Sequence, residues 1–384
     1  MPTSWTRAIA IGNRIRLCAS ETAYGAELER IVGLAAPHLA PDRPNLICLT
    51  EALGLPAALT GPRAALARRA RTAEAALTLL ALAHQRELAA ARHRWPGISL
   101  ARALLLARAD ALYRPFARTL SRLARRYRAH IVATTFAPRL AEPLPLEEGA
   151  PGRVEPAGPE VYNAALVFGP DGALLSRVDK VYLTSSELTS LDLSPAPLAD
   201  VAVIATEAGR LGVAISLDAF TPTYLRRLDD LGARIVVQPD ANDQPWAAPS
   251  ALCEWQPREW MDSTLGSIQP SYPNLRYNIC AMQTGPLFDI IFDGQSSVTA
   301  RDAPPPSGPG GRYVAVDECR HSHTGERFQG GFLALAPWVA PDPVVAEPWL
   351  TLEQRRARLA TIARGLRPED YRESVIWADL AMDE

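Results

Sequence analysis

Three polar residues stand where strand-like runs of the chain end, and together they could carry out acyl transfer. Glu51 follows the apolar residues 45–50, Lys180 follows a predicted hairpin, and Ser216 lies between an apolar run and a predicted helix. A carboxylate can accept the proton of a nucleophile, and an ammonium can stabilise the oxyanion that forms on the attacked carbon. Taken singly, each residue is more simply explained as a surface charge or a helix-capping serine.

Lys180 is the single lysine among the 40 lysine and arginine residues of the chain. An arginine stays protonated and presents a wide fork, whereas a lysine offers a compact ammonium that fits a tight site. A chain so strongly biased toward arginine therefore favours a chemical role for its one lysine.

The spacing of apolar residues predicts a layered α/β architecture, in which strands alternate with helices. We expect helices over residues 26–39, 105–127, 224–231 and 352–364, and we expect Pro115 to kink or split the second of them. The strand-like runs are residues 8–11, 15–18, 45–50, 131–136, 161–168, 173–178, 201–206, 211–216, 234–238, 277–283, 290–292 and 313–317.

Four segments between residues 45 and 300 resemble the nitrilase superfamily of carbon–nitrogen hydrolases, and they occur in the family's order. In residues 161–183 an Asn-bearing strand, a Gly-Pro-x-Gly turn and a second strand lead to the lysine, and residues 209–239 resemble the nucleophile segment. Residues 46–51 are similar to the segment of the glutamate base, and residues 292–296 are similar to a late Phe-x-Gly-x-Ser element. The resemblance implies an α/β fold of the nitrilase type, a four-layer α-β-β-α sandwich.

The same resemblance implies a role for each residue of the acyl-transfer set. Glu51 corresponds to the general base, Lys180 to the lysine that stabilises the oxyanion, and Ser216 to the nucleophile, which is a cysteine in the family. The backbone N–H of Leu217 would help to bind the oxyanion.

Two further acidic residues are site candidates by resemblance. Glu187 corresponds to a second glutamate that orients substrate and lysine, although a solvated loop charge explains it equally well. Asp218 fits the Cys-x-Asp sequence pattern of the amidase branches better than the pattern of true nitrilases. The resemblance therefore implies a small, non-peptide amide as substrate in preference to a nitrile, with no cofactor and no metal.

Serine at position 216 departs from the family pattern in a way that affects the chemistry. A thiol is readily activated by a neighbouring base, whereas a hydroxyl needs stronger activation, usually through an oriented histidine. No histidine of this chain lies in a matching motif, so we expect turnover to be very low or absent. Three explanations stay open: an engineered Cys→Ser substitution, a natural pseudoenzyme that serves as a ligand-binding or assembly module, and a working serine hydrolase.

Length and charge predict the organisation outside the site. We expect one hydrolase domain over residues 1–336, with a helical, Arg-rich insertion at about residues 57–100, and a tail over residues 337–384 at a subunit interface of a homo-dimer or larger homo-oligomer. Residues 61–128 contain 15 arginines and only three carboxylates. Such a surplus could bind an anionic substrate, a membrane surface or a partner, but solvated arginines on packed helices explain it more simply.

The remaining composition narrows the class of protein. A formal net charge of −2 gives no reason to expect nucleic acid as a partner. The five cysteines are odd in number and form no Cys-x-x-Cys pair, which argues against a disulfide framework and a zinc site. No signal-peptide core and no membrane-length apolar run occurs in the sequence, so we expect a cytoplasmic protein.

Overall fold

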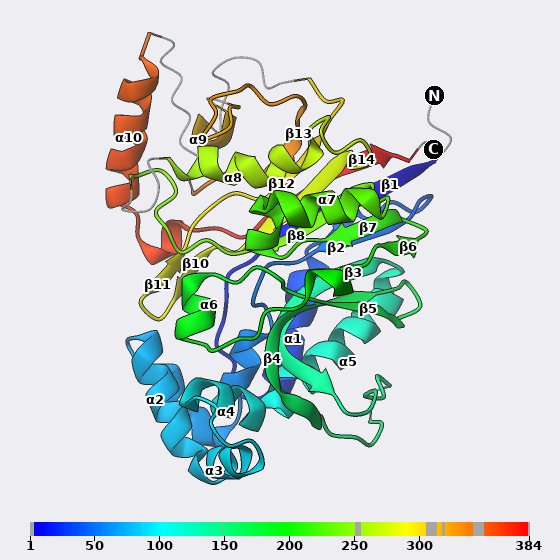
Figure 1. Cartoon of the computed structure of the whole chain (residues 1–384). Coiled ribbons are helices and arrows are strands. Elements are labelled where there is room, and N and C mark those ends of the chain that lie inside the picture. The colour runs from blue at the N-terminus through cyan, green and yellow to red at the C-terminus, as the bar shows by residue number, and fades with distance from the viewer. Residues whose placement is uncertain are drawn as a thin grey trace.

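Two six-stranded sheets face each other in the computed structural model (Figure 1). The model describes residues 4–147, 149–249, 255–304, 313–316, 319–340 and 349–382. In spatial order, the first sheet consists of β14 (Ser374–Ala381), β1 (Trp5–Gly12), β2 (Asn45–Cys48), β3 (His130–Leu140), β4 (Pro156–Phe168) and β5 (Leu174–Asp179). The second consists of β13 (Gly331–Leu335), β12 (Ser297–Ala300), β9 (Tyr277–Met282), β8 (Ile235–Asp240), β7 (Gly209–Val213) and β6 (Ile204–Thr206).

Both faces of each sheet are buried, which explains why the central strands are apolar on both sides. Successive side chains of a strand point to opposite faces. In β1, Ala8 and Ala10 belong to the core between the two sheets, whereas Ile9 and Ile11 belong to the core under the helices. The same alternation in the other central strands lets small and branched side chains fill the space between the sheets.

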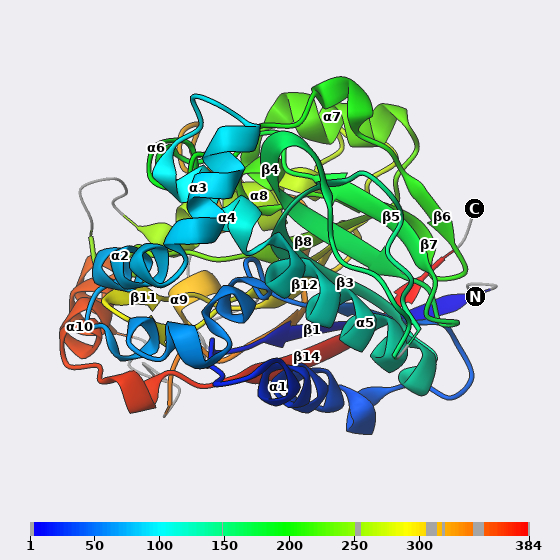
Figure 2. The ribbon, with the colours of Figure 1, turned by 90° about the horizontal axis from the view of Figure 1, so that it is seen from below.

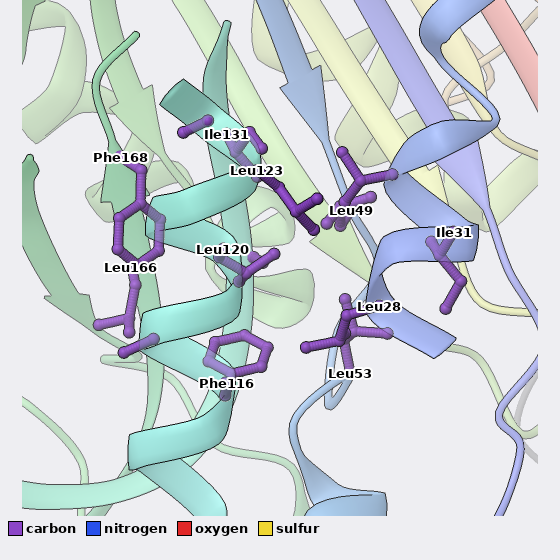
Figure 3. Close-up of a cluster of buried hydrophobic side chains, with 14 of the residues drawn as sticks. Leu28, Ile31, Leu49, Leu53, Phe116, Leu120, Leu123, Ile131, Leu166 and Phe168 are labelled. Carbon is purple, nitrogen blue, oxygen red and sulfur yellow. The ribbon is translucent and has the colours of Figure 1, made fainter. Parts of the chain in front are cut away.

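Helices cover the outer face of each sheet and complete four layers. On the first sheet lie α1 (Glu21–Gly33) and α5 (Ala109–Tyr127), which pack with Leu28, Phe116 and Leu120 against strand residues such as Phe168 (Figure 3). On the second lie α7 (Pro222–Asp230) and α8 (Gln256–Thr264) (Figure 1). The predicted α/β fold, an α-β-β-α sandwich of the nitrilase type, is therefore confirmed.

The Arg-rich segment forms a group of helices at one end of the sandwich: α2 (Ala73–Ala83), α3 (Gln85–Arg94) and α4 (Leu100–Ala107) (Figures 1 and 2). It contacts the hairpin of β10 (Gly285–Leu287) and β11 (Ile290–Phe292), where Asp289 accepts the Ala73 N–H at 2.8 Å. It also contacts the loop after α6 (Ser185–Thr189), where Arg102 pairs with Asp192 at 2.7 Å. The insertion thus packs against elements that border the sequence-predicted site.

Several arginines of this segment donate to backbone carbonyls, which a lysine would do less well. Arg108 donates through Nε to Ala58 O at 3.0 Å and through Nη2 to Thr60 O at 3.1 Å. Arg68 donates through Nη1 to Leu59 O and Gly61 O. Because the guanidinium is a planar fork, one side chain can hold two carbonyls of an irregular segment. These contacts account for part of the arginine content, and the membrane or partner role stays a prediction.

Three local predictions were wrong. Residues 313–317 were expected as a strand but include α9 (Tyr313–Val316), because a short apolar run fits either structure. Residues 15–18 form no strand. The helix over residues 105–127 is interrupted at Arg108, between α4 and α5, and Pro115 lies inside α5.

The last part of the chain contributes both a helix and a strand. The helix α10 (Leu352–Arg364) matches the predicted bounds. The strand β14 pairs antiparallel with β1, so the end of the chain already belongs to the first sheet. A subunit-interface role for residues 337–384 stays a prediction.

No helix in the described ranges has both the length and the apolar character that crossing a membrane requires.

The turn that carries Glu51 depends on a close approach of two chain segments at Gly54. A Cβ at Gly54 would lie 2.0 Å from Oγ1 and 2.9 Å from Cα of Thr135 on β3. We expect Gly54→Ala to destabilise the protein by about 1–3 kcal/mol, because the backbone of a central strand cannot move aside. Urea unfolding measures this, with Gly25→Ala in α1 as control, since its Cβ would meet only Thr119 Oγ1 at 3.4 Å. The control should gain about 0.5–1 kcal/mol, and equal effects of the two changes would contradict the packing argument.

Candidate active site

Lys180 lies between two glutamates in a buried ion-pair cluster. It follows the last residue of β5, and its Nζ is 2.7 Å from Glu51 Oε1 and 3.0 and 2.9 Å from the two oxygens of Glu187. The lysine is 1% exposed and both glutamates are buried. Because charge pairs in a low-dielectric interior are held in a fixed geometry by their hydrogen bonds, the ammonium has one defined position.

Glu187 is fixed from a second side by the helix that carries it. It is the third residue of α6, and its Oε2 accepts the Thr184 N–H at 2.8 Å and the Thr184 hydroxyl at 3.1 Å, as part of a capping box. Its side chain therefore faces Lys180 and the helix cap, and the solvated loop charge considered from sequence does not describe it.

Asn163 on β4 links the two glutamates and was not among the predicted site residues. Its Nδ2 donates to Glu51 Oε1 at 2.8 Å and to Glu187 Oε1 at 2.9 Å, while its Oδ1 is buried without a hydrogen-bond partner. One amide thus sets the spacing of two like charges. The signal in the sequence was a single polar residue within the apolar run 161–168.

Ser216 starts a short 3₁₀ turn (Ser216–Phe220) between β7 and α7 and has a left-handed backbone, with φ of 46°. A residue other than glycine rarely adopts this conformation unless the surrounding structure enforces it, and such residues cluster at functional sites. Its side chain is largely buried, and Leu217, next in the chain, is partly exposed. The oxyanion role of the Leu217 N–H stays a prediction.

Asp218 ties the Ser216 turn to the segment that follows Lys180. Its Oδ1 accepts the Tyr182 N–H at 2.8 Å and the Val181 N–H at 3.2 Å, and its side chain is fully buried. The Asp218 carboxylate, a site candidate by resemblance, thus binds the protein's own backbone. This contact brings the turn of residue 216 and the lysine segment side by side.

Asp240, the last residue of β8, lies where the Glu51 and Ser216 segments meet, and it was missed from sequence. Its carbonyl accepts the Glu51 N–H at 3.4 Å, and its carboxylate accepts Gln238 Nε2 at 2.7 Å and the Ala241 N–H at 2.9 Å. Its Oδ2 also accepts a hydrogen bond from Cys280 Sγ at 3.8 Å. The strand expected over residues 234–238 ended two residues before Asp240, whereas β8 includes it, so the sequence did not mark this residue.

Burial dominates the electrostatics of these carboxylates. It raises the pKa of Glu51 to about 7 against the attraction of Lys180, and it raises the pKa of Asp218 to about 7. It also raises the pKa of Asp240. Glu187 differs: burial acts to raise its pKa, but the charge and hydrogen bonds of Lys180 outweigh this, so its pKa lies below the ordinary value.

Lys180 carries the buried positive charge that acts to lower the pKa of the neighbouring carboxyl groups. Burial alone would lower its pKa, but the paired Glu51 and Glu187 raise it above the ordinary value. The site therefore provides a permanent ammonium beside Glu51, a carboxyl group poised to exchange a proton near neutral pH. That combination suits acyl transfer.

Within the described ranges, no group of three or more His, Cys, Asp and Glu side chains is arranged to hold a metal ion.

The chain belongs to the carbon-nitrogen hydrolase family, whose model matches residues 65–302. The matched region contains Lys180, Glu187 and Ser216, and Glu51 precedes it.

Three solved structures are similar to this chain at low sequence identity. A carbon-nitrogen hydrolase from Helicobacter pylori G27 has a TM-score of 0.49 and 15% identity over 77% of this chain and 82% of its own. An amidase from Nesterenkonia sp. has a TM-score of 0.43 and 16% identity over 78% of this chain and 83% of its own. A cysteine-to-serine mutant of the Nesterenkonia AN1 amidase has a TM-score of 0.45 and 16% identity over 94% and 98%. No curated protein sequence matches this chain.

The raised pKa of Asp218 predicts how the stability of the protein changes with pH. A carboxyl group whose pKa is higher in the folded than in the unfolded state stabilises the fold when protonated, and this contribution is lost as pH rises from about 4 through about 7. We expect Asp218→Asn, which keeps an oxygen to accept the Tyr182 N–H, to gain free energy of unfolding relative to the natural chain as pH rises from 5 to 8. Urea unfolding at several pH values measures the difference, with the exposed Asp243→Asn as control. A difference that does not change with pH would rule out the argument.

Proposed function

We propose that this protein hydrolyses a small, non-peptide amide by acyl transfer through residue 216. The observation that carries the proposal is the buried Lys180 ammonium, 2.7 Å from Glu51, together with the Asp218 contacts that hold the Ser216 turn beside the lysine segment. A carboxylate, an ammonium and a nucleophile on three different strand ends form a set that acyl transfer requires.

The proposed reaction has two stages. Ser216 Oγ attacks the amide carbon while Glu51 accepts its proton, and the oxyanion is stabilised by Lys180 Nζ and the Leu217 N–H. The tetrahedral intermediate expels ammonia or an amine, which takes the proton from Glu51 and leaves an ester on Ser216. Glu51 then accepts a proton from water as the water attacks the ester, and that proton returns to Oγ when the acid is released.

Serine at position 216 makes slow turnover part of the proposal. Because a hydroxyl is harder to deprotonate than a thiol, the natural chain should be much slower than a cysteine variant acting through the same base. An amide is favoured over a nitrile because Ser216 and Asp218 form a Ser-x-Asp segment that is similar to the Cys-x-Asp pattern of amidases. The second candidate, a ligand-binding or assembly module built on the same fold, is favoured only by the serine itself.

The proposal also covers the location, the oligomeric state and the partners of the protein. We infer a cytoplasmic homo-dimer or larger homo-oligomer that needs no cofactor, with residues 337–384 at the subunit interface. The arginines of the insertion remain open to contact with a membrane surface or an anionic partner.

Ammonia release from a panel of amides and nitriles tests the function. We expect Ser216→Cys to hydrolyse at least one amide faster than the natural chain, and Glu51→Gln in that background to lose roughly 10²–10⁴-fold in kcat, the usual contribution of a general base. Trapping of the ester by mass spectrometry identifies the acylated residue. Absence of turnover and of acylation in both chains, with unchanged ligand binding in Glu51→Gln, would favour the binding module instead.

Lys180→Arg tests whether a compact ammonium is required. Glu51 and Glu187 both contact the Lys180 ammonium, so a guanidinium does not fit in its place without displacing one of them. In the Ser216→Cys background we expect a loss of about 10²–10³-fold in kcat, the cost of one oxyanion donor. The matched control is Arg139→Lys, a half-exposed ion pair with Asp179 and Asp200, which should leave kcat within about twofold. Full activity of Lys180→Arg would remove the oxyanion role.

A further inference from the structure

Asn163 contacts every member of the buried ion-pair cluster, although the hydrolysis proposed above leaves it without a role. Its Nδ2 donates to Glu51 Oε1 at 2.8 Å and to Glu187 Oε1 at 2.9 Å. Its backbone carbonyl accepts the Lys180 N–H at 2.9 Å. Asn163 is 1% exposed, so bulk water does not compete for these contacts.

The first sheet fixes the backbone of Asn163 from both sides. The residue lies inside β4, where it is paired with Phe136 of β3, and the next residue, Ala164, is paired with Asp179 of β5. A strand held by ladder hydrogen bonds on both sides has little freedom to shift. The short side chain of asparagine therefore sets the position of its two N–H groups.

The hydrogen bonds of the cluster occupy every carboxylate oxygen except Glu51 Oε2. Glu51 Oε1 accepts Lys180 Nζ at 2.7 Å in addition to Asn163 Nδ2. Glu187 Oε1 accepts the same two donors, and Glu187 Oε2 accepts Lys180 Nζ together with the N–H and the hydroxyl of Thr184. Among the described residues, none donates a hydrogen bond to Glu51 Oε2.

This pattern decides where Glu51 can take up a proton. A carboxylate oxygen has two lone pairs, and both lone pairs of Glu51 Oε1 are used by donors that keep their own hydrogen atoms. A proton can therefore add only at Oε2. Lys180 by itself would leave one lone pair of Oε1 open, so the amide of Asn163 completes the distinction between the two oxygens.

We propose that Asn163 is a positioning residue for the hydrolysis, which by binding Oε1 of both glutamates assigns the proton transfers to Glu51 Oε2 and keeps Glu187 out of them. The inference rests on the proposed amide hydrolysis and names the atom that performs its proton transfers. Oε2 takes the proton of Ser216 as Oγ bonds to the amide carbon, and gives it to the departing nitrogen. It then takes a proton from the attacking water and returns it to Oγ as the ester bond breaks, so every proton taken is given back.

The charges that face Glu51 agree with this division of roles. Burial raises the pKa of Glu51 to about 7, Lys180 acts to lower it, and Glu187 and Asp240 act to raise it further. Burial also acts to raise the pKa of Glu187, but the charge of Lys180 and the hydrogen bonds that Glu187 accepts outweigh this. A hydrogen bond to a charged form stabilises that form, so removing the N–H groups of Asn163 should raise the pKa of Glu51.

Asn163→Leu tests the role, because leucine has a similar volume and no N–H group. In the Ser216→Cys background we expect a loss of roughly 10²-fold in kcat with little change in KM, since Asn163 acts on the base and not on the substrate. In a chain that also carries Glu51→Gln, the same change should cost no further activity, because no base is left to position. A residue that only supports the fold would lower kcat in both backgrounds.

Carbon NMR of protein labelled at the glutamate carboxyl carbons gives a readout that does not depend on turnover. The resonance of Glu51 is the one that disappears in Glu51→Gln, and its chemical shift followed against pH gives the pKa. Asn163→Leu in the natural chain should raise this pKa by about one unit or more. Asn163→Ala, whose side chain is smaller than that of asparagine, repeats both measurements if the leucine variant does not fold.

Asn278→Leu is the matched control, because Asn278 on β9 is equally buried but binds only neutral groups. Its Nδ2 donates to Gln238 Oε1 at 2.9 Å and to Ser267 Oγ at 3.1 Å. As in Asn163, its Oδ1 is buried and has no hydrogen-bond partner among the described residues. The control should lower stability in urea unfolding, but it should change neither the pKa of Glu51 nor the ratio of kcat between the two backgrounds.

The outcomes distinguish failure of this inference from failure of the proposed function. If Ser216→Cys turns over amides while Asn163→Leu leaves the pKa of Glu51 unchanged, or lowers kcat equally with and without Glu51, the positioning role is overturned and amide hydrolysis stands. If no variant turns over an amide, amide hydrolysis fails, and the positioning role fails with it even where the pKa of Glu51 shifts.

Discussion

The site depends on one buried ammonium that must balance several buried carboxylates. Lys180 pairs directly with Glu51 and Glu187, while Asp218 and Asp240 lie in the same low-dielectric region. One positive charge cannot compensate four negative charges, so some of these groups must hold protons near neutral pH. The directions of the pKa shifts follow from this imbalance: Glu187, with both oxygens on the lysine, stays ionised, and the others are raised. Because several acidic groups are buried around one basic group, the site contains both a proton donor and a proton acceptor at the same pH.

The fold tolerates this imbalance of buried charge because backbone contacts hold the charged groups in place. The residues come from the ends of β2, β5, β7 and β8 and from the short helix α6, and the stacked sheets bring these ends to one place. Asp218 and Asp240 then link the pieces, since the Asp218 carboxylate binds the segment after Lys180 and the Asp240 carbonyl accepts the Glu51 N–H. Polar groups placed in this way need little reorganisation when charge develops during a reaction.

The sequence predicted the layered fold and the acyl-transfer set for identifiable reasons. Strands buried on both faces are apolar throughout, and Lys180 stands out in a chain that otherwise uses arginine. Asn163 and Asp240 were missed because only contacts between distant parts of the chain bring them to the site: Asn163 meets Glu51 across 112 residues. Periodicity reports which face of an element is buried and not which partner a buried polar side chain will find. The misassigned strand at residues 313–317 shows the same limit for short apolar runs.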